Sequence, residues 1–256
     1  MINIVKKEIK ALKLMKREPK KLYYLGNLNL LDKKIVSIVG TRRPSNYTKE
    51  FTYKLSKALS KRGIVVASGA AMGVDAIAHS GAGAKNTIAV MANGLDIKYP
   101  SVNRTLIEEI EKSGLTLSFF EEGFRATKWS FVNRNELVVA LGEVLIITEA
   151  DLNSGSLRSA EFALNMKKPI YVIPHRLNES LGTNMLLKES KAKVIYDIEE
   201  FANQYGNIRE EKDEFLLFLE SSPILDEAIL RYGNKIYEAE LEGLISIENG
   251  VIRVEK

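Results

Sequence analysis

The chain has 256 residues, 45% of them hydrophobic and 27% charged, with a formal net charge of +4, a composition typical of a globular protein with room for one large domain and a small one. It has no cysteine and two histidines, His79 and His175, which excludes disulfides and thiolate nucleophiles and leaves little for a zinc or iron site. No apolar stretch approaches the ~20 residues that span a bilayer, and the lysine-rich start lacks the apolar segment of a secretory signal, so we expect a cytoplasmic protein without metal or membrane association.

The first 33 residues combine two short patterns. Residues 4–13 form an amphipathic, basic stretch with helical spacing, and residues 21–27 form an extended piece. We interpret residues 1–33 as a basic lead-in segment and not as a domain.

From residue 34 the pattern becomes regular, because apolar runs of strand length alternate with helical segments. The predicted strands are 35–39, 64–67, 87–91, 115–119, 144–148, 170–173 and 194–196. The predicted helices are 47–61, 72–82, 102–113, 132–141, 156–167 and 184–191. Continuously apolar strands are typical of a sheet with helices on both faces. Residues 34–206 are therefore predicted to form a doubly wound, mostly parallel α/β domain.

After Gly206 the pattern changes. Three short helices are predicted around 215–219, 226–230 and 236–241. A hairpin is predicted next, because two apolar runs flank Asn249 and Gly250, the strongest short hairpin signal. Residues 207–256 therefore resemble a small winged-helix-like α+β domain.

The charge is unevenly distributed between these segments. Residues 207–256 hold 6 Lys and Arg against 12 Asp and Glu, whereas residues 1–206 hold 31 against 21. Attraction to a polyanion follows the local field, so any nucleic-acid surface is expected on the first 206 residues. For the acidic C-terminal segment we favour partner docking or packing over DNA binding.

The first candidate site follows the strand predicted at 35–39. Gly40 and Thr41 form a turn that opens a helix, and Arg42 and Arg43 stand in it. Free N–H groups and the helix dipole favour an anionic oxygen there, at the edge where open α/β sheets bind ligands. The turn therefore indicates a phosphate site, although solvated arginines would give the same sequence.

The second strand-to-helix loop begins at Ser68 and Gly69 and is rich in small residues. It is neither a Walker A loop nor a Gly-x-Gly-x-x-Gly motif, so ATP hydrolysis and dinucleotide redox chemistry both lose support. Phosphate contact and tight helix–sheet packing explain it equally well. Asp75 and His79 share one helical face, where a local hydrogen bond explains them without catalysis.

Cations and aromatic rings alternate over residues 124–135, a combination suited to single-stranded nucleic acid. Lys128 is placed to neutralise a phosphate and Phe131 to stack on a base or shape a pocket. Arg134 and Asn135 are expected to begin a helix and reach back toward Gly40. Trp129, the single tryptophan, is equally well explained as a buried anchor, and Phe131 has the same alternative as a core residue.

A third loop follows the strand predicted at 144–148. Ser154 or Ser156 is a natural N-cap, and Gly155 and Ser156 add possible donors at the same edge of the sheet. Glu149 and Asp151 offer a different interpretation, in which they are the acid and base of a hydrolase.

Several of these motifs together resemble the DNA-processing protein A (DprA/Smf) family. The resemblance runs from about Tyr24 to Phe201 in matching order and spacing, with Ala70 where the family has a second glycine. The motifs that carry it are 25–27, 38–45, 68–75, 87–96, Tyr99 with Pro100, Asn103, 131–135 and 154–160.

The resemblance implies an extended Rossmann-like domain that binds single-stranded DNA without sequence preference. It further implies a homodimer that helps load RecA during natural transformation, with no catalytic turnover and no cofactor. Together with the residue patterns, it gives a set of candidate DNA-binding residues: Gly40, Thr41, Arg42, Arg43, Ser68, Gly69, Lys128, Phe131, Arg134, Asn135, Gly155 and Ser156.

Two other classes of protein remain open at this point. One is a Rossmann-like hydrolase that acts on a nucleoside monophosphate, with Glu149 and Asp151 in catalysis. The other is a protein that mainly docks partners through its acidic C-terminal segment.

Overall fold

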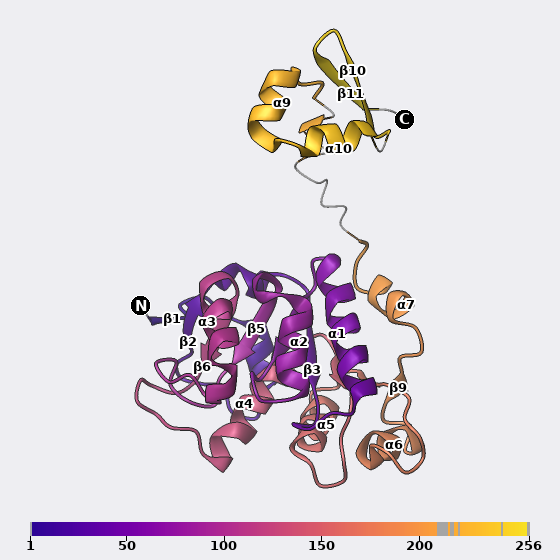
Figure 1. The fold of residues 1–256 in the computed structure, drawn as a ribbon. Coiled ribbons are helices and arrows are strands. Elements are labelled where there is room, and N and C mark those ends of the chain that lie inside the picture. The colour runs from indigo at the N-terminus through magenta and orange to yellow at the C-terminus, as the bar shows by residue number, and fades with distance from the viewer. Residues whose placement is uncertain (1, 209–214, 216–217, 220, 242, 255–256) are drawn as a thin grey trace. The chain divides into compact units, whose positions relative to one another are not determined.

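The chain divides into two compact units, residues 1–208 and residues 209–256 (Figure 1). The computed structural model describes residues 2–208, 215, 218–219, 221–241 and 243–254. Each unit has its own hydrophobic core. In the described part of the chain, no helix has the length and apolar character needed to cross a membrane.

The larger unit is built on a nine-stranded sheet with the strand order β1-β2-β6-β5-β4-β3-β7-β8-β9. Its strands are β1 (Asn3–Ile4), β2 (Tyr23–Gly26), β3 (Ile35–Val39), β4 (Val65–Ser68), β5 (Thr87–Val90), β6 (Leu115–Ser118), β7 (Leu145–Ile147), β8 (Ile170–Val172) and β9 (Lys193–Val194). The run from β6 to β9 is parallel, while β1 and β2 are antiparallel additions at one edge. The prediction of a mostly parallel sheet is confirmed.

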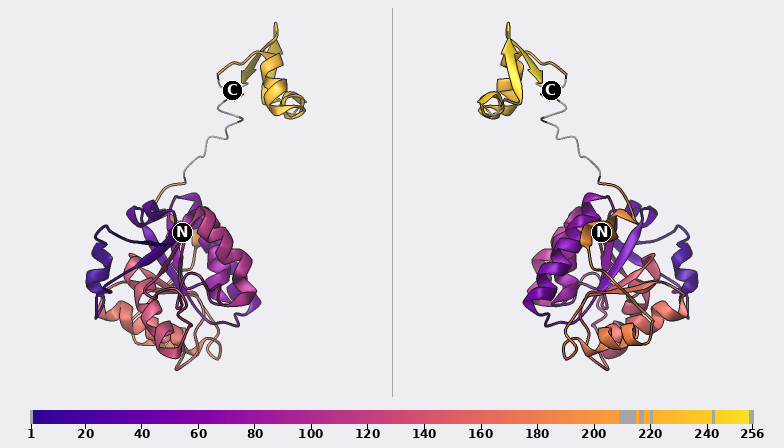
Figure 2. Two further views of the ribbon diagram at one scale, coloured as in Figure 1. Left: turned by 90° about the vertical axis from the view of Figure 1, so that its left-hand side faces the viewer. Right: turned by 90° about the vertical axis from the view of Figure 1, so that its right-hand side faces the viewer.

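Both faces of this sheet are covered by helices (Figure 2). The helices on one face are α1 (Asn46–Lys61), α2 (Val74–Ala82), α3 (Arg104–Ser113) and α7 (Ile198–Asn203), and those on the other are α4 (Lys128–Leu141), α5 (Gly155–Asn165) and α6 (Leu181–Lys188). Four short 3-10 helices complete the described residues 2–208 of this unit: η1 (Lys10–Leu14), η2 (Leu28–Asp32), η3 (Ala84–Asn86) and η4 (Ser101–Asn103).

The central strand β3 is buried on both faces, and this explains its apolar sequence. Ile35 and Val39 pack into the core on the α4 side, whereas Val36 and Ile38 pack into the core on the α1 side. Successive side chains of a strand point to opposite faces, so a strand covered on both faces has no solvent-facing position.

The prediction for the N-terminal residues is wrong in part. Instead of an amphipathic helix over residues 4–13, the chain forms β1 and the 3-10 helix η1. The reason is tertiary pairing, because β1 pairs with β2 and β2 pairs with β6. Leu12 and Met15 are buried in the core beside α4. These residues therefore extend the sheet and cover its α4 face.

Helix α4 begins four residues before its predicted start. Thr127 accepts a hydrogen bond from the N–H of Ser130, and Ser130 Oγ accepts one from the N–H of Thr127. This reciprocal capping box fixes the helix start at Lys128. Arg134 and Asn135 consequently lie in the second turn of α4 and do not begin it.

The smaller unit contains α9 (Leu225–Tyr232), α10 (Lys235–Leu241) and a hairpin of β10 (Ile245–Glu248) and β11 (Val251–Val254). Asn249 and Gly250 connect the two strands with φ values of 51° and 77°, as a two-residue hairpin turn requires. The hairpin and the last two predicted helices are confirmed. The helix predicted at 215–219 lies partly outside the described residues.

Candidate nucleic-acid interface

Three loops meet at one edge of the larger sheet. They follow β3, β4 and β7 and span residues 40–45, 69–73 and 148–154. Strand β3 lies between β4 and β7. The strand order runs from β3 to β4, β5 and β6 on one side and from β3 to β7, β8 and β9 on the other, so it reverses at β3. Ligands of open α/β sheets bind at such a reversal, outside the carboxyl ends of the strands.

The first two loops touch each other through glycines. The N–H of Val74 donates to the carbonyl of Thr41 at 3.1 Å. A Cβ on Gly40 would lie 2.6 Å from the Val74 side chain, and a Cβ on Gly73 would lie 2.5 Å from the Thr41 carbonyl oxygen. Gly73 also has a φ of +77°, which favours glycine. The small residues are therefore needed for close packing of the two loops.

Glu149 fixes the end of the first loop. Its Oε2 accepts hydrogen bonds of 3.0 Å from both the N–H and the hydroxyl of Ser45, which is the N-cap of α1. The N–H of Thr41 donates to the Glu149 carbonyl at 2.9 Å. Asp151 is exposed and lies outside this arrangement. The geometry gives Glu149 a structural role in place of the acid or base role considered for a hydrolase.

Cationic and aromatic side chains converge on the outer side of this edge. Arg42, Arg43 and Lys128 are exposed. The Cζ of Arg42 lies 5.3 Å from the ring centroid of Phe131, and that ring lies 6.1 Å from the ring of Tyr99. Lys128 and Phe131 are three residues apart on α4 and so share one face of the helix.

Arg134 lies beneath this surface and is 4% exposed. Its Nη1 donates to the carbonyls of Gly69 and Val90, and its Nε donates to Asn135 Oδ1 at 3.1 Å. A Cβ on Gly69 would fall 2.3 Å from the Arg134 Cζ. Nη1 of this guanidinium is directed toward backbone oxygens, so Arg134 supports the loop, and its direct contact with DNA stays a prediction.

Asp75 and His79 hold the same loop but do not bond to each other. The N–H of Ala70 donates to His79 Nε2 at 3.2 Å, and the N–H of Ala71 donates to Asp75 Oδ2 at 3.3 Å. Asn103 Nδ2 donates to both of these alanine carbonyls at 3.0 Å. The expected bond between Asp75 and His79 is wrong, because both side chains satisfy buried loop N–H groups instead.

The protonation of this pair follows from its burial. Burial first, and then the positive charge of Arg134, lowers the pKa of His79 to about 3. Because Nε2 accepts from Ala70, Nδ1 carries the proton and donates to Thr87 Oγ1 at 2.6 Å. Burial raises the pKa of Asp75, while the charge of Arg134 opposes that shift.

The neutral state of His79 predicts acid sensitivity of the fold. Below pH 6.5 the unfolded histidine binds a proton that the folded one does not, so stability falls as pH falls toward 3. Between pH 7.5 and 5.0 the wild type should lose about 2 kcal/mol more unfolding free energy than His79→Gln. Urea unfolding of both proteins at the two pH values measures this difference. The raised pKa of Asp75 has the opposite effect on stability, but both proteins contain Asp75, so its effect cancels in the comparison. Equal losses of unfolding free energy in the two proteins would contradict a neutral, buried His79.

The remaining predicted site residues divide into buried and exposed groups. Ser68 is fully buried and its hydroxyl donates to the Ile38 carbonyl at 2.7 Å, which gives that side chain a packing role, and a contact of this residue with DNA stays a prediction. Ser154 caps α5, Gly155 is the exposed first residue of that helix, and Ser156 is buried. Gly155 is therefore exposed at this edge, and Ser154 is partly exposed.

A small pocket lies between the arginines and the aromatic rings, with a volume of about 30 Å³. It is lined by Arg42, Gly69, Ala71, Met72, Ala92, Asn93, Tyr99, Pro100, Phe131 and Arg134. Sites that enclose small ligands typically measure about 300–1,000 Å³. The edge therefore suits an extended ligand lying over it better than an enclosed nucleoside monophosphate. In the described part of the chain, His, Asp and Glu side chains form no group of three that could hold a metal ion.

Two half-exposed side chains of this pocket, those of Met72 and Tyr99, were not among the predicted DNA-binding residues. Met72 and Tyr99 are 46% and 48% exposed beside Phe131. Tyr99 was recognisable in the sequence, because it stands in the loop after β5, which ends at the same edge as β3 and β4. Met72 gave no signal distinct from that of a core methionine.

Comparison with known proteins identifies relatives of the larger unit. The family model described as DNA recombination-mediator protein A matches residues 5–206. The chain is 35% identical to DNA processing protein DprA of Streptococcus pneumoniae over 182 residues, 69% of this chain and 64% of that protein. It is 38% identical to Protein Smf of Synechocystis over 163 residues, 61% of this chain and 41% of that protein. The chain thus matches less than two thirds of the length of these relatives.

Two solved structures share the fold. DNA processing protein A of Helicobacter pylori, whose structure concerns its single-stranded DNA binding mode, aligns with a TM-score of 0.78 and 45% identity. That alignment covers 80% of this chain and 95% of the other. DprA of Streptococcus pneumoniae aligns with a TM-score of 0.73 and 30% identity, covering 81% and 75% of the two chains.

Proposed function

The chain belongs to the DNA recombination-mediator protein A family, and we propose that it binds single-stranded DNA without sequence preference across the edge formed by the loops after β3, β4 and β7. The observation that carries this proposal is the convergence of exposed cations, Arg42, Arg43 and Lys128, around the half-exposed rings of Phe131 and Tyr99. Cations with stacking rings are the features of sequence-tolerant single-strand binding.

The side chains divide into two roles in this proposal. Arg42, Arg43 and Lys128 contact phosphates, which positions the strand but carries no sequence information. Phe131 and Tyr99 offer stacking faces, which every base has. Arg134 acts through the loop it supports, because its Nη1 donates to two backbone carbonyls and its Nε donates to Asn135 Oδ1.

The family membership and the relatives support a wider role for the whole protein. We propose that it is a cytoplasmic mediator that acts as a homodimer, protects incoming single strands and helps to load RecA during natural transformation. We propose no catalytic step. Glu149, one of the two carboxylates considered for a nucleotide hydrolase, accepts two hydrogen bonds from Ser45, which supports a structural role for it.

The salt dependence of binding tests the phosphate contacts. Three contacts predict a slope of about −2 in a plot of log affinity against log salt, since each contributes about −0.7 on a single strand. Lys128→Ala should make the slope shallower by about 0.7 and weaken all sequences alike. Fluorescence anisotropy of labelled oligonucleotides over a salt series gives both quantities.

The control is Lys61→Ala, an exposed lysine at the last position of α1. It removes the same charge at the end of the helix that lies farther from Ser45 and the binding edge. A Lys128→Ala slope no shallower than that of the control would contradict a phosphate contact by Lys128.

A further inference from the structure

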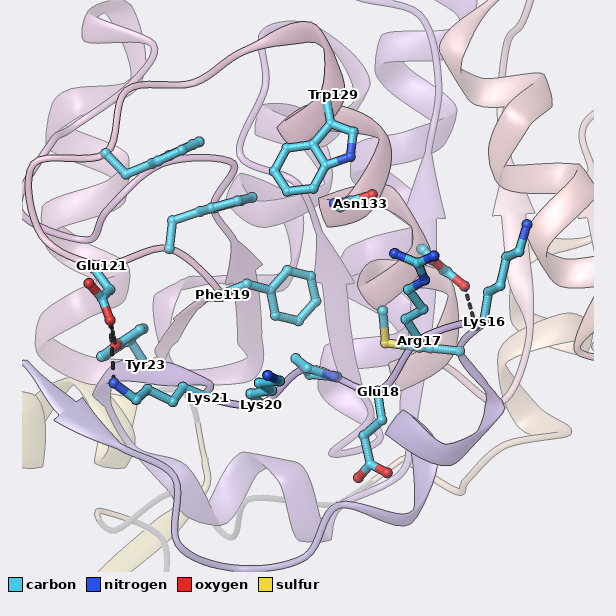
Figure 3. Close-up of a pocket in the computed structure, with 15 residues that line it drawn as sticks. Lys16, Arg17, Glu18, Lys20, Lys21, Tyr23, Phe119, Glu121, Trp129 and Asn133 are labelled. Carbon is cyan, nitrogen blue, oxygen red and sulfur yellow. Dashed lines mark hydrogen bonds and ion pairs between the residues drawn. The ribbon is translucent and has the colours of Figure 1, made fainter.

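A second and larger pocket lies on the other side of the first turn of α4 (Figure 3). Its volume is about 700 Å³, and its walls are the N-terminal residues 15–21 with Tyr23, the loop residues 119–121 with Phe124, and one face of α4. This size falls within the range of about 300–1,000 Å³ for ligand sites.

Helix α4 presents different residues to the two sites. Trp129, Asn133 and Glu136 line the larger pocket, at the spacing of one helical face. Phe131 stands two residues from Trp129, on another side of the helix, and lines the small pocket at the binding edge. The first turn of α4 thus separates an aromatic residue at the proposed DNA-binding edge from an aromatic residue in the larger pocket.

The aromatic side chains of the larger pocket are arranged for stacking. Trp129 is 62% exposed, and it meets Phe120 edge-on with ring centroids 5.9 Å apart. Phe120 in turn stacks on Phe124 at 4.3 Å with the ring planes 10° from parallel. The edge-on contact leaves much of the indole surface without a protein partner. The indole of Trp129, the single tryptophan of the chain, therefore offers a stacking face to another flat group.

The charges around the pocket favour an anionic chain. The basic side chains at its walls are Lys16, Arg17, Lys20 and Lys21. Among the carboxylates, Glu121 accepts from Lys21 Nζ at 3.3 Å and from the Tyr23 hydroxyl at 3.0 Å, and Glu136 accepts from the N–H of Lys16 at 2.7 Å. Glu18 is the third acidic group of the walls. Two of the three carboxylates are thus already bonded to protein donors.

We propose that this pocket takes a base of the same DNA strand whose phosphates lie along the edge, with Trp129 as its stacking partner. The inference rests on the proposed function, because the strand must first bind at Arg42 and Arg43. An α-helix with its side chains is only about 10–12 Å across, so a strand crossing the N-terminus of α4 connects the two sites. Lys128 stands at that N-terminus and is exposed, where it faces the connecting phosphate.

Intrinsic fluorescence tests the stacking directly, since Trp129 is the one tryptophan. A mixed-sequence single-stranded oligonucleotide should quench its emission, whereas an oligonucleotide of the same length with abasic residues should leave it nearly unchanged. In anisotropy titrations with the base-containing strand, Trp129→Ala should bind roughly 10-fold more weakly, and Trp129→Phe should bind like the wild type. Tyr53→Ala, at an aromatic residue 45% exposed on α1, is the matched control and should not weaken binding.

The outcomes separate this inference from the proposed function. If the wild type binds the strand, and Trp129→Ala binds it equally well, the second site is wrong and the edge site stands. Self-association that depends on Trp129, with unchanged DNA affinity, would assign the pocket to a second copy of the chain and likewise overturn the inference. If the folded wild type does not bind single-stranded DNA at low salt, both proposals fail.

Discussion

Alanine at both Arg42 and Arg43 is expected to weaken the binding of single-stranded DNA by at least about 100-fold, because each of the two charge-assisted hydrogen bonds contributes roughly 1.5–3 kcal/mol. Both side chains are exposed, and among the described residues neither forms an ion pair that would hold it away from a ligand. The loss should be the same for all sequences, since phosphates and not bases are contacted. Anisotropy titrations at one fixed salt concentration with several oligonucleotides measure it.

The double variant Lys57→Ala/Lys61→Ala is the control for total charge. It removes two positive charges from exposed positions in the last turns of α1, while Asn46 at the start of α1 lies beside the binding edge. A helix of 16 residues is about 24 Å long, so the two ends are well separated. An equal loss in the two double variants, or a loss confined to particular bases, would contradict direct phosphate contact by the arginines.

Arg134→Met is expected to destabilise the folded protein by about 3–5 kcal/mol, because it removes a buried guanidinium that donates to two backbone carbonyls and offsets the charge of the buried Asp75 carboxyl. The substitution deprives the Gly69 and Val90 carbonyls of their donor and leaves the buried Asp75 without its nearby positive charge. Urea unfolding measures the change in unfolding free energy.

Lys128→Met is the matched control, because it makes the same chemical change at an exposed position of the same helix. It should change the unfolding free energy by less than about 0.5 kcal/mol while weakening DNA binding. Asp75→Asn introduced into Arg134→Met should recover part of the lost stability. If Arg134→Met unfolds at the same urea concentration as the wild type, Arg134 does not stabilise the loop. The direct contact of Arg134 with DNA, predicted from the sequence, would then be favoured.

The parallel core of the fold was predictable because its signal is local and strong. Strand β3 is buried at all five positions, so its continuous apolar run has one simple explanation. The N-terminal residues were mispredicted because β1 has only two residues, and no local pattern identifies a strand of that length. Its conformation depends on pairing with β2, which in turn depends on β6, where the paired residues are 89–95 positions apart in sequence.

The site was predictable to the level of loops but not of side-chain direction. Arg42 and Arg43 follow directly from their place after a parallel strand. Ser68 ends β4 before a Gly-rich turn and Arg134 lies in the second turn of α4, and a polar residue at either place has the same sequence signature whether it points to solvent or to buried backbone. Composition likewise did not decide between a buried and an exposed Trp129. Such choices depend on packing between segments distant in sequence.

The most direct test of the central claim is the affinity of the wild-type protein for single-stranded and double-stranded oligonucleotides of mixed sequence across a salt series. We predict tighter binding of the single strand that weakens steadily as salt rises. Absence of binding to single strands at low salt by well-folded protein, or equal affinity for both forms, would contradict the claim that this edge is a single-strand DNA site.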